Sequence, residues 1–286
     1  AIKKGNNIEA LRLLKSNLKK DENHIDSLYL AAVSSRYLKN YDHSKKYIES
    51  LLTNAPEMGR AYQELGHLNR DIGNEEDSIK HYRQACELNP ALPSSWKALY
   101  SYFKKNENKP AADHAYMQMN TLETMPNTLL FISQILNEGK LGIAEEKCRE
   151  FLKQYPTNTY AMSLLSDIAD RLGYFDDAEF LLESAVKLSP SDGELRMKYA
   201  MILRKKQKFA KTMEQVNILC EKFPENLSYQ AQKASEIMQN GDHKGAIDLF
   251  DDILKKNPYN FSILTSKGHA QKTLGESDRA IKSYQT

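Results

Sequence analysis

Apolar and small residues recur along this chain at spacings of three and four residues, without the strict alternation of apolar and polar positions typical of a half-buried strand. Such spacings place side chains on one face of an α-helix. One part of the chain illustrates the pattern with Tyr62, Leu65 and Gly66, followed by Ser78 and Tyr82. The pattern predicts an all-α chain of short amphipathic helices.

Helix-breaking residues divide this pattern at a nearly constant period. Successive prolines lie 34, 36, 30, 34, 34 and 34 residues apart, and a series of glycines lies 17 residues before a proline wherever both are present. A period near 34 in a helical chain predicts a solenoid of helical hairpins. We expect each glycine to form a left-handed C-cap after the first helix of a hairpin, and each proline to follow the second helix. The residues are Pro56, Pro90, Pro126, Pro156, Pro190, Pro224 and Pro258, with Gly73, Gly139, Gly173, Gly241 and Gly275.

The repeating residues match a known pattern, in which W-x2-L-G-x2-Y is followed by A-x3-F and then proline. Trp96-x2-Leu99-x3-Phe103 followed by Ala112-x3-Tyr116 is one example. The chain therefore resembles the tetratricopeptide repeat family over essentially its whole length. The resemblance implies a right-handed superhelical solenoid of antiparallel hairpins with about seventeen helical segments, as a piece of a longer protein truncated at both ends. The expected units are a half repeat over 1–22, full repeats over 23–56, 57–90, 91–124, 125–156, 157–190, 191–224 and 225–258, and a partial repeat over 259–286.

Two classes of buried position are expected in each hairpin. Small residues should allow the two helices to approach closely, and a bulky residue at the opposite level should fill the space that opens. Trp96 is expected to be buried between the helices of its hairpin. The small residues are Gly66, Ser166, Ala200, Ala234 and Gly268 on first helices, and Ser44, Ser78, Ala112, Ala144, Ala178, Ala246 and Ala280 on second helices. The bulky residues are Tyr82, Tyr116, Leu182, Phe250 and Tyr284.

Two departures from the period carry predictions of their own. The step from Gly73 to Gly139 is two residues short of two periods, and we place the missing pair in a linker over 121–126, where the superhelical pitch should change. The unit over 191–224 has Gln207 in place of a turn glycine and Arg196 where a large apolar residue is usual. We expect this unit to be the least regular.

The family resemblance also implies that first helices line a concave wall. A basic set and a methionine set stand out among the wall positions of this chain. The basic set predicts a groove that steers an acidic peptide or an anionic tail of a protein partner, and methionines suit an adaptable surface. The competing interpretation is that the cations are simply solvated and the methionines fill gaps in the core. The candidate partner-binding residues are Arg36, Arg60, His67, Arg70, Lys97, Lys104, Lys105, Met197, Met201 and Met238.

Composition narrows the function further. Forty Lys and Arg against 38 Asp and Glu leave a net charge of +2, which does not favour a partner bound through nucleic-acid phosphates. Cys86, Cys148 and Cys220 are an odd number and far apart, so a reducing compartment such as the bacterial cytoplasm is expected. No apolar run is long enough to span a membrane. The histidines lack metal-ligand spacing and no catalytic or phosphate-binding motif occurs. We therefore predict no catalytic residue, metal or cofactor, and no enzymatic activity, in this chain.

The final segment shows a narrower resemblance. Residues 267–275 read KGHAQKTLG and are followed by Ala280, Ile281 and Tyr284. This combination resembles the last repeat of bacterial tetratricopeptide-containing sulfotransferases. The resemblance implies an interaction scaffold that docks substrates or partners for a sulfotransferase domain located after residue 286. The alternative is a stand-alone adaptor or assembly factor that uses the same groove without an attached enzyme.

Overall fold

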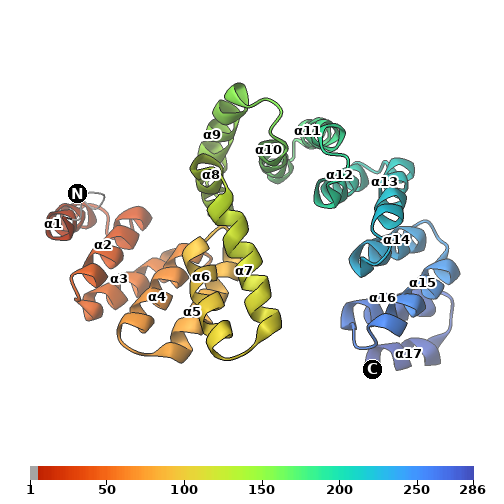
Figure 1. Ribbon diagram of the computed structural model, residues 1–286, viewed down its shortest axis with the longest axis horizontal. Coiled ribbons are helices and arrows are strands. Elements are labelled where there is room, and N and C mark those ends of the chain that lie inside the picture. Colours follow the sequence, from red (N-terminus) through yellow and green to blue (C-terminus); the bar gives the residue numbers. More distant parts are fainter. Residues whose placement is uncertain (1–5) are drawn as a thin grey trace. The chain divides into compact units, whose positions relative to one another are not determined.

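The computed structural model describes residues 6–286, which form seventeen α-helices and no β-strand (Figure 1). The predicted fold class and the predicted number of helical segments are confirmed for this part of the chain. By their contacts the residues divide into two compact units, 1–148 and 149–286, and each is described by itself. No helix within 6–286 has the length and apolar character needed to cross a lipid bilayer.

The first unit begins with a single helix, which is followed by helices that pair through short turns. Helices α2 and α3, α4 and α5, and α6 and α7 pack against each other as pairs, and α3 and α5 also contact the pair that follows. Helix α9 continues across the division into the second unit. The helices are α1 (Asn7–Leu18), α2 (Ile25–Tyr37), α3 (Tyr41–Asn54), α4 (Gly59–Asp71), α5 (Glu75–Leu88), α6 (Pro93–Lys105), α7 (Lys109–Thr124), α8 (Asn127–Asn137) and α9 (Leu141–Gln154).

The second unit repeats the same arrangement. Each second helix of a pair contacts both its own partner and the first helix of the next pair. The helices are α10 (Thr159–Arg171), α11 (Phe175–Leu188), α12 (Gly193–Lys205), α13 (Phe209–Lys222), α14 (Leu227–Gln239), α15 (His243–Lys256), α16 (Phe261–Thr273) and α17 (Ser277–Gln285).

Every turn within a pair contains one residue with positive φ. In five turns this residue is one of the predicted glycines, so the predicted left-handed C-caps are confirmed. The amide of the next residue then donates to the carbonyl five residues earlier, as Asn74 does to Asn69 over 2.8 Å. These bonds satisfy carbonyl groups that the end of a helix would otherwise leave unpaired.

The prediction that the unit over 191–224 is the least regular is wrong. Gln207 takes φ 57° in the turn, as Lys39 and Glu107 do in two other turns. Lys208 N then donates to Leu203 O over 2.9 Å, so the cap forms without glycine. Helices α12 and α13 have 13 and 14 residues, as α10 and α11 do. The turn requires a left-handed conformation, which a non-glycine residue can adopt at a cost of about 1–2 kcal/mol.

The predicted small residues occupy the helix contacts. All twelve are buried, and an ideal Cβ at Gly66 would lie only 2.6 Å from the ring of Tyr82. The bulky residues Tyr82, Leu182 and Phe250 are fully buried. Tyr116 and Tyr284 are the exceptions, with 48% and 45% of their surface exposed, and the prediction that they fill the core is wrong for these two.

Trp96 is half-buried rather than enclosed between its two helices. Its ring lies edge-on to His114 of α7, with the ring centroids 5.5 Å apart. Its indole Nε1 donates to the carbonyl of Pro90 over 2.8 Å. Arg196 occupies the equivalent place in its own repeat and donates from Nη2 to the carbonyl of Pro190 over 3.2 Å. Arg196 therefore keeps the same joint between repeats, which explains why it does not disturb the fold.

The missing pair of residues lies in a helix and not in the predicted linker. Helix α7 runs through Thr124, so most of the segment 121–126 is helical. Helix α8 begins 34 residues after α6, in register, but has 11 residues where α4 and α6 have 13. The chain therefore shortens α8 while the spacing of helix starts is kept.

Candidate functional site

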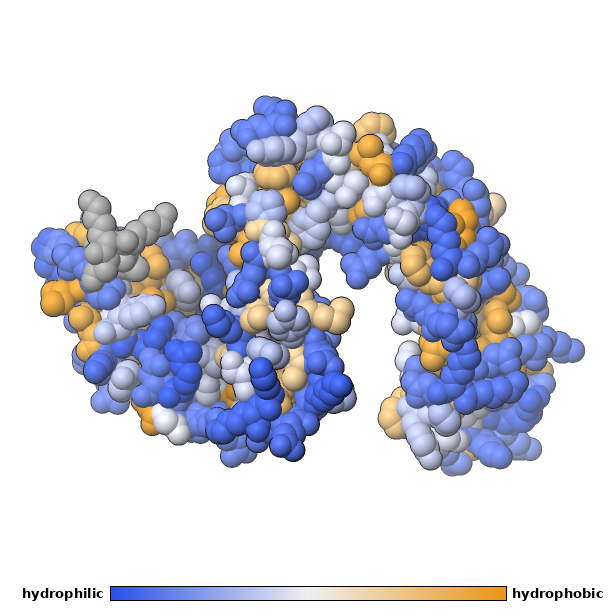
Figure 2. All heavy atoms as spheres, in the orientation of Figure 1, coloured by the Kyte–Doolittle hydropathy of each residue, from blue (hydrophilic) through white to orange (hydrophobic). Residues whose placement is uncertain are grey.

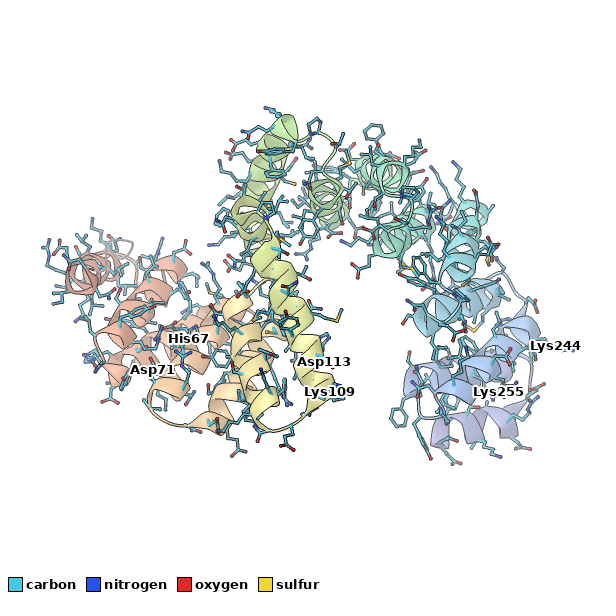
Figure 3. All side chains as sticks on the ribbon, viewed as in Figure 1. His67, Asp71, Lys109, Asp113, Lys244 and Lys255 are labelled. Carbon is cyan, nitrogen blue, oxygen red and sulfur yellow. The ribbon has the colours of Figure 1, made fainter. Side chains whose placement is uncertain are left out.

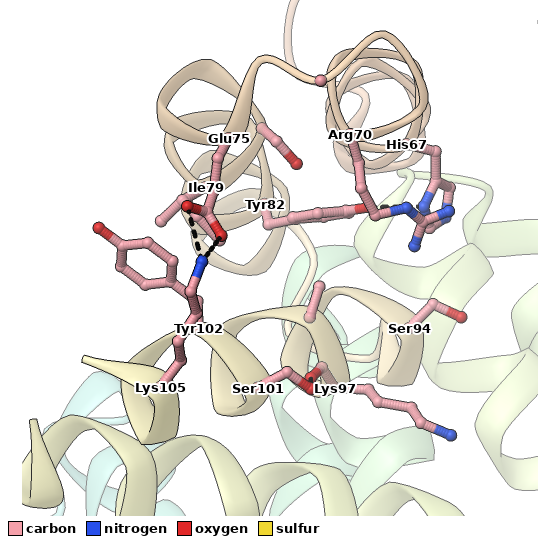
Figure 4. A pocket seen from close by; sticks show the side chains of 13 residues that line it. His67, Arg70, Glu75, Ile79, Tyr82, Ser94, Lys97, Ser101, Tyr102 and Lys105 are labelled. Carbon is pink, nitrogen blue, oxygen red and sulfur yellow. Dashed lines mark hydrogen bonds and ion pairs between the residues drawn. The ribbon is translucent and has the colours of Figure 1, made fainter. Parts of the chain in front are cut away.

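A cleft of about 560 Å³ lies between the α4–α5 pair and helix α6 (Figure 4). We call it the α4–α6 cleft. Its apolar lining includes Ile79 and Tyr82 of α5 and Tyr102 of α6. Arg70 of α4 and Lys97 of α6 add positive charge to the lining. The cleft thus combines apolar surface with cations contributed by two successive repeats.

Four of the ten predicted partner-binding residues line this cleft, namely His67, Arg70, Lys97 and Lys105. Lys105 bonds Glu75 over 2.9 Å at the edge of the cleft (Figure 4). Arg70 makes one contact of 3.3 Å to its neighbour Asp71, and Lys97 has no ion pair within residues 6–286. Two of the cleft's cations therefore remain largely uncompensated.

His67 contributes a neutral ring to the cleft. Its Nδ1 lies 2.6 Å from the hydroxyl of Tyr82, and the two rings meet edge-on. Burial lowers the pKa of His67 to about 4, and the charges of Arg36 and Arg70 act in the same direction. The imidazole is therefore uncharged at neutral pH and acts as a hydrogen-bonding partner rather than as a cation.

Arg36 does not belong to an open surface. Its side chain is 8% exposed and bonds Glu64 over 2.6 Å and Asp71 over 2.8 Å. Although burial alone would lower the pKa of Arg36, the bonds to these two carboxylates hold it above its ordinary value. Figure 3 labels His67 and Asp71, one turn apart on α4. The structure therefore assigns Arg36 to the joint between α2 and α4.

Two further predicted cations lie outside the cleft. Arg60 of α4 bonds Glu138 over 2.6 Å through Nη2, and its guanidinium lies 4.8 Å from the centre of the Tyr29 ring. Lys104 is exposed, and its Nζ lies 5.5 Å from the centre of the Tyr100 ring. Arg60 is therefore already engaged, whereas Lys104 is exposed on α6 beside the cleft.

The predicted methionine set lies in the second unit and is only partly exposed. Met201 is 43% exposed and Met197 is half-buried, both on α12. Met238 packs against the buried cluster that contains Ala234 and Phe250. Met238 therefore fills core space, which corrects the expectation of an open surface at that position.

First helices of neighbouring repeats are joined by ion pairs at several places, and the α4–α6 cleft differs in this respect. Within the described residues no ion pair joins α4 to α6, where Ser95 Oγ instead donates to Gln63 Oε1 over 3.0 Å. Ion pairs between other first helices are Arg36–Glu64 for α2 and α4, Lys198–Asp167 and Lys205–Asp170 for α10 and α12, and Arg204–Glu236 for α12 and α14. The cations of the α4–α6 cleft lack such carboxylate partners from the facing helix.

The surface around the cleft is strongly polar. On the face shown in Figure 2, apolar side chains form scattered spots among hydrophilic ones. Reasoning from sequence identified the cations of the cleft but missed the partner of Arg60, because Glu138 lies 78 residues away. No local spacing in the sequence signals such a contact.

A family model described as Tetratricopeptide repeat matches residues 59–92 and 160–192. The first match covers α4, α5 and the loop before α6, and the second covers α10 and α11. The chain therefore contains tetratricopeptide repeats, and such repeats act as scaffolds for protein partners.

Solved structures with similar folds share little sequence with this chain. A crystal structure of MamA is 17% identical, covers 56% of this chain and 92% of MamA, and has a TM-score of 0.49. A MamA RS-1 ArsTM double mutant is 11% identical, covers 57% of this chain and 93% of its own, and has a TM-score of 0.49. The APC/C hetero-tetramer Cut9–Hcn1 is 14% identical with a TM-score of 0.45, and the match covers 92% of this chain and 52% of that one.

Proposed function

We propose that this chain is an interaction scaffold that binds an acidic segment of a protein partner in the α4–α6 cleft. One observation carries the proposal: Arg70 and Lys97 line a cleft with apolar surface, and no carboxylate of the facing helix neutralises them. Uncompensated cations raise the association rate of an acidic segment and select against basic ones. Apolar side chains of the partner would then be buried against Tyr82 and Tyr102.

The proposal is tested with a labelled peptide in which glutamate alternates with leucine, and with its glutamine counterpart. The double variant Arg70→Glu, Lys97→Glu should weaken binding of the acidic peptide by about a hundredfold, from two charge-assisted contacts, and should flatten its salt dependence. Lys80→Glu, which reverses an exposed lysine on α5, is the matched control. Equal binding of the acidic and glutamine peptides to the wild-type chain would refute the proposal.

We further propose that the scaffold is the docking part of a larger bacterial protein with a sulfotransferase domain. The support for this step is the resemblance of residues 267–275 and of the helix that follows. That support is narrow, because Gly268 and His269 of this stretch meet Tyr284 just as Gly66 and His67 meet Tyr82, and a packing contact explains both.

The reading frame after residue 286 tests this second step. A sulfate-donor-binding domain encoded there would support it. The competing proposal, a stand-alone adaptor with the same cleft, requires a stop codon close to that point. Both alternatives keep the same prediction for the acidic peptide.

A further inference from the structure

The turn between α8 and α9 lies against α2 and α4, although several helices separate them in the chain. Glu138 accepts a hydrogen bond of 2.6 Å from Arg60 Nη2. Lys140 Nζ lies 2.9 Å from Asp26 Oδ1, a contact between residues 114 positions apart. Repeats in a solenoid ordinarily contact only their neighbours. A contact that links the first full repeat with the fourth therefore requires an explanation of its own.

The carboxylate of Glu138 lies in an enclosed position. Its side chain is 4% exposed, and that of Arg60 is 26% exposed. The guanidinium of Arg60 lies over the ring of Tyr29, and burial raises the pKa of Tyr29 to about 12. Charge-assisted hydrogen bonds to a cation held over an aromatic ring are strong interactions for a carboxylate. We call Tyr29 and Arg60 the Arg60 site.

The Arg60 site and the α4–α6 cleft share one helix. Arg60 and Arg70 are ten residues apart on α4, which corresponds to about 15 Å along the helix axis. Both belong to the predicted wall positions, and both are cations. One of them holds a carboxylate from the same chain, whereas the other has only a 3.3 Å contact with its neighbour Asp71.

We infer that the Arg60 site is a second carboxylate-binding position of the same groove, and that Glu138 occupies it until an acidic side chain of the partner replaces it. This inference rests on the proposed function. It also specifies the partner. An extended peptide advances about 3.4 Å per residue, so two acidic side chains should lie about four or five residues apart to reach Arg60 and Arg70 together.

The inference is tested with two labelled peptides and the full chain. The two-acid peptide carries glutamates about four residues apart, and the one-acid peptide has glutamine in place of one of them. Glu138→Ala should tighten the two-acid peptide about tenfold, because one charge-assisted contact becomes available, and should leave the one-acid peptide unchanged. Adding Arg60→Ala should remove the gain. Glu123→Ala, which deletes an exposed carboxylate on α7, is the control.

The outcomes separate the inference from the proposed function. If Lys97→Glu abolishes binding while Glu138→Ala changes neither peptide, the inference is wrong and the proposed function stands. If neither peptide binds any variant, both are wrong. Should Glu138→Ala fail to fold, Glu138→Gln removes the charge while keeping the shape, and the same selective gain for the two-acid peptide is expected.

Discussion

The hydroxyl of Tyr82 lies 2.6 Å from Nδ1 of His67, and glycine at position 66 makes this contact possible. The tyrosine ring of a second helix crosses over the glycine of the first helix and reaches the side that carries the cleft. The same arrangement recurs in the last pair, where the hydroxyl of Tyr284 lies 3.1 Å from Nδ1 of His269. Packing of the core and polarity of the groove are therefore linked through one ring.

Substituting Gly66 with alanine should destabilise the fold. The added Cβ would lie 2.6 Å from the ring of Tyr82, which cannot move without disturbing the core. We expect a loss of about 1–3 kcal/mol in the free energy of unfolding, measured with urea. Gly142→Ala is the control, because a Cβ there meets nothing within 4 Å, and it should be neutral or slightly stabilising. A stable Gly66→Ala variant would contradict the close packing described for this pair.

Acid should destabilise the first unit through His67. Its pKa is lowered to about 4, mainly by burial, against an ordinary value of 6.5. Between these values the unfolded chain binds the proton and the folded chain does not, so stability falls as the pH drops from about 6.5 to 4. The full shift corresponds to at most about 3 kcal/mol.

The measurement for His67 is urea unfolding across this pH range in the wild type and in His67→Gln. The variant lacks the titrating ring, so its stability should fall less on acidification. Parallel pH profiles for the two proteins would show that His67 does not carry this effect.

Replacing Gln207 with glycine should stabilise the protein. Gln207 has φ 57°, a conformation that glycine adopts without strain. We expect a gain of about 1 kcal/mol in the free energy of unfolding, visible as a higher midpoint in thermal or urea unfolding. Gly173→Ala makes the reverse change at the equivalent turn, where φ is 80°, and should lose a similar amount. Opposite signs for the two variants are required.

Truncation of Trp96 should separate its packing from its hydrogen bond. Trp96→Ala should cost about 3 kcal/mol, the low end for a buried aromatic, because the ring is half-buried. Trp96→Phe keeps much of the contact with His114 and loses the bond to the Pro90 carbonyl, so about 1 kcal/mol is expected. Equal losses for the two variants would show that the hydrogen bond alone matters. Urea unfolding provides both values.

Local features of the chain were predictable from its sequence. Helix positions and the conformations of the five turn glycines depend on residues within one hairpin, and both are confirmed. The cations of the cleft were also identified, since wall positions follow from the same period. Gln207 misled the prediction because a required backbone conformation can be imposed on an unfavoured residue.

Contacts between distant residues were not predictable. The burial of Arg36 depends on Glu64 and Asp71 in the next repeat, and the engagement of Arg60 depends on Glu138 further along. Neither pairing has a fixed spacing that a period would reveal. The counting of charges along a wall therefore overestimates its free positive charge, because it omits carboxylates that fold onto it.

Trp96, Arg196 and Gln230 are three unlike side chains that donate to the carbonyl of the proline six residues before each of them. What the chain preserves at this point is an N–H group at the right height. Evolution can exchange an aromatic ring for a charged or an amide group there and keep the neighbouring hairpins seated. Ancestry traced by residue identity alone will accordingly count fewer repeats than the backbone contains, as the two matched stretches illustrate against a run of helix pairs on both sides of them.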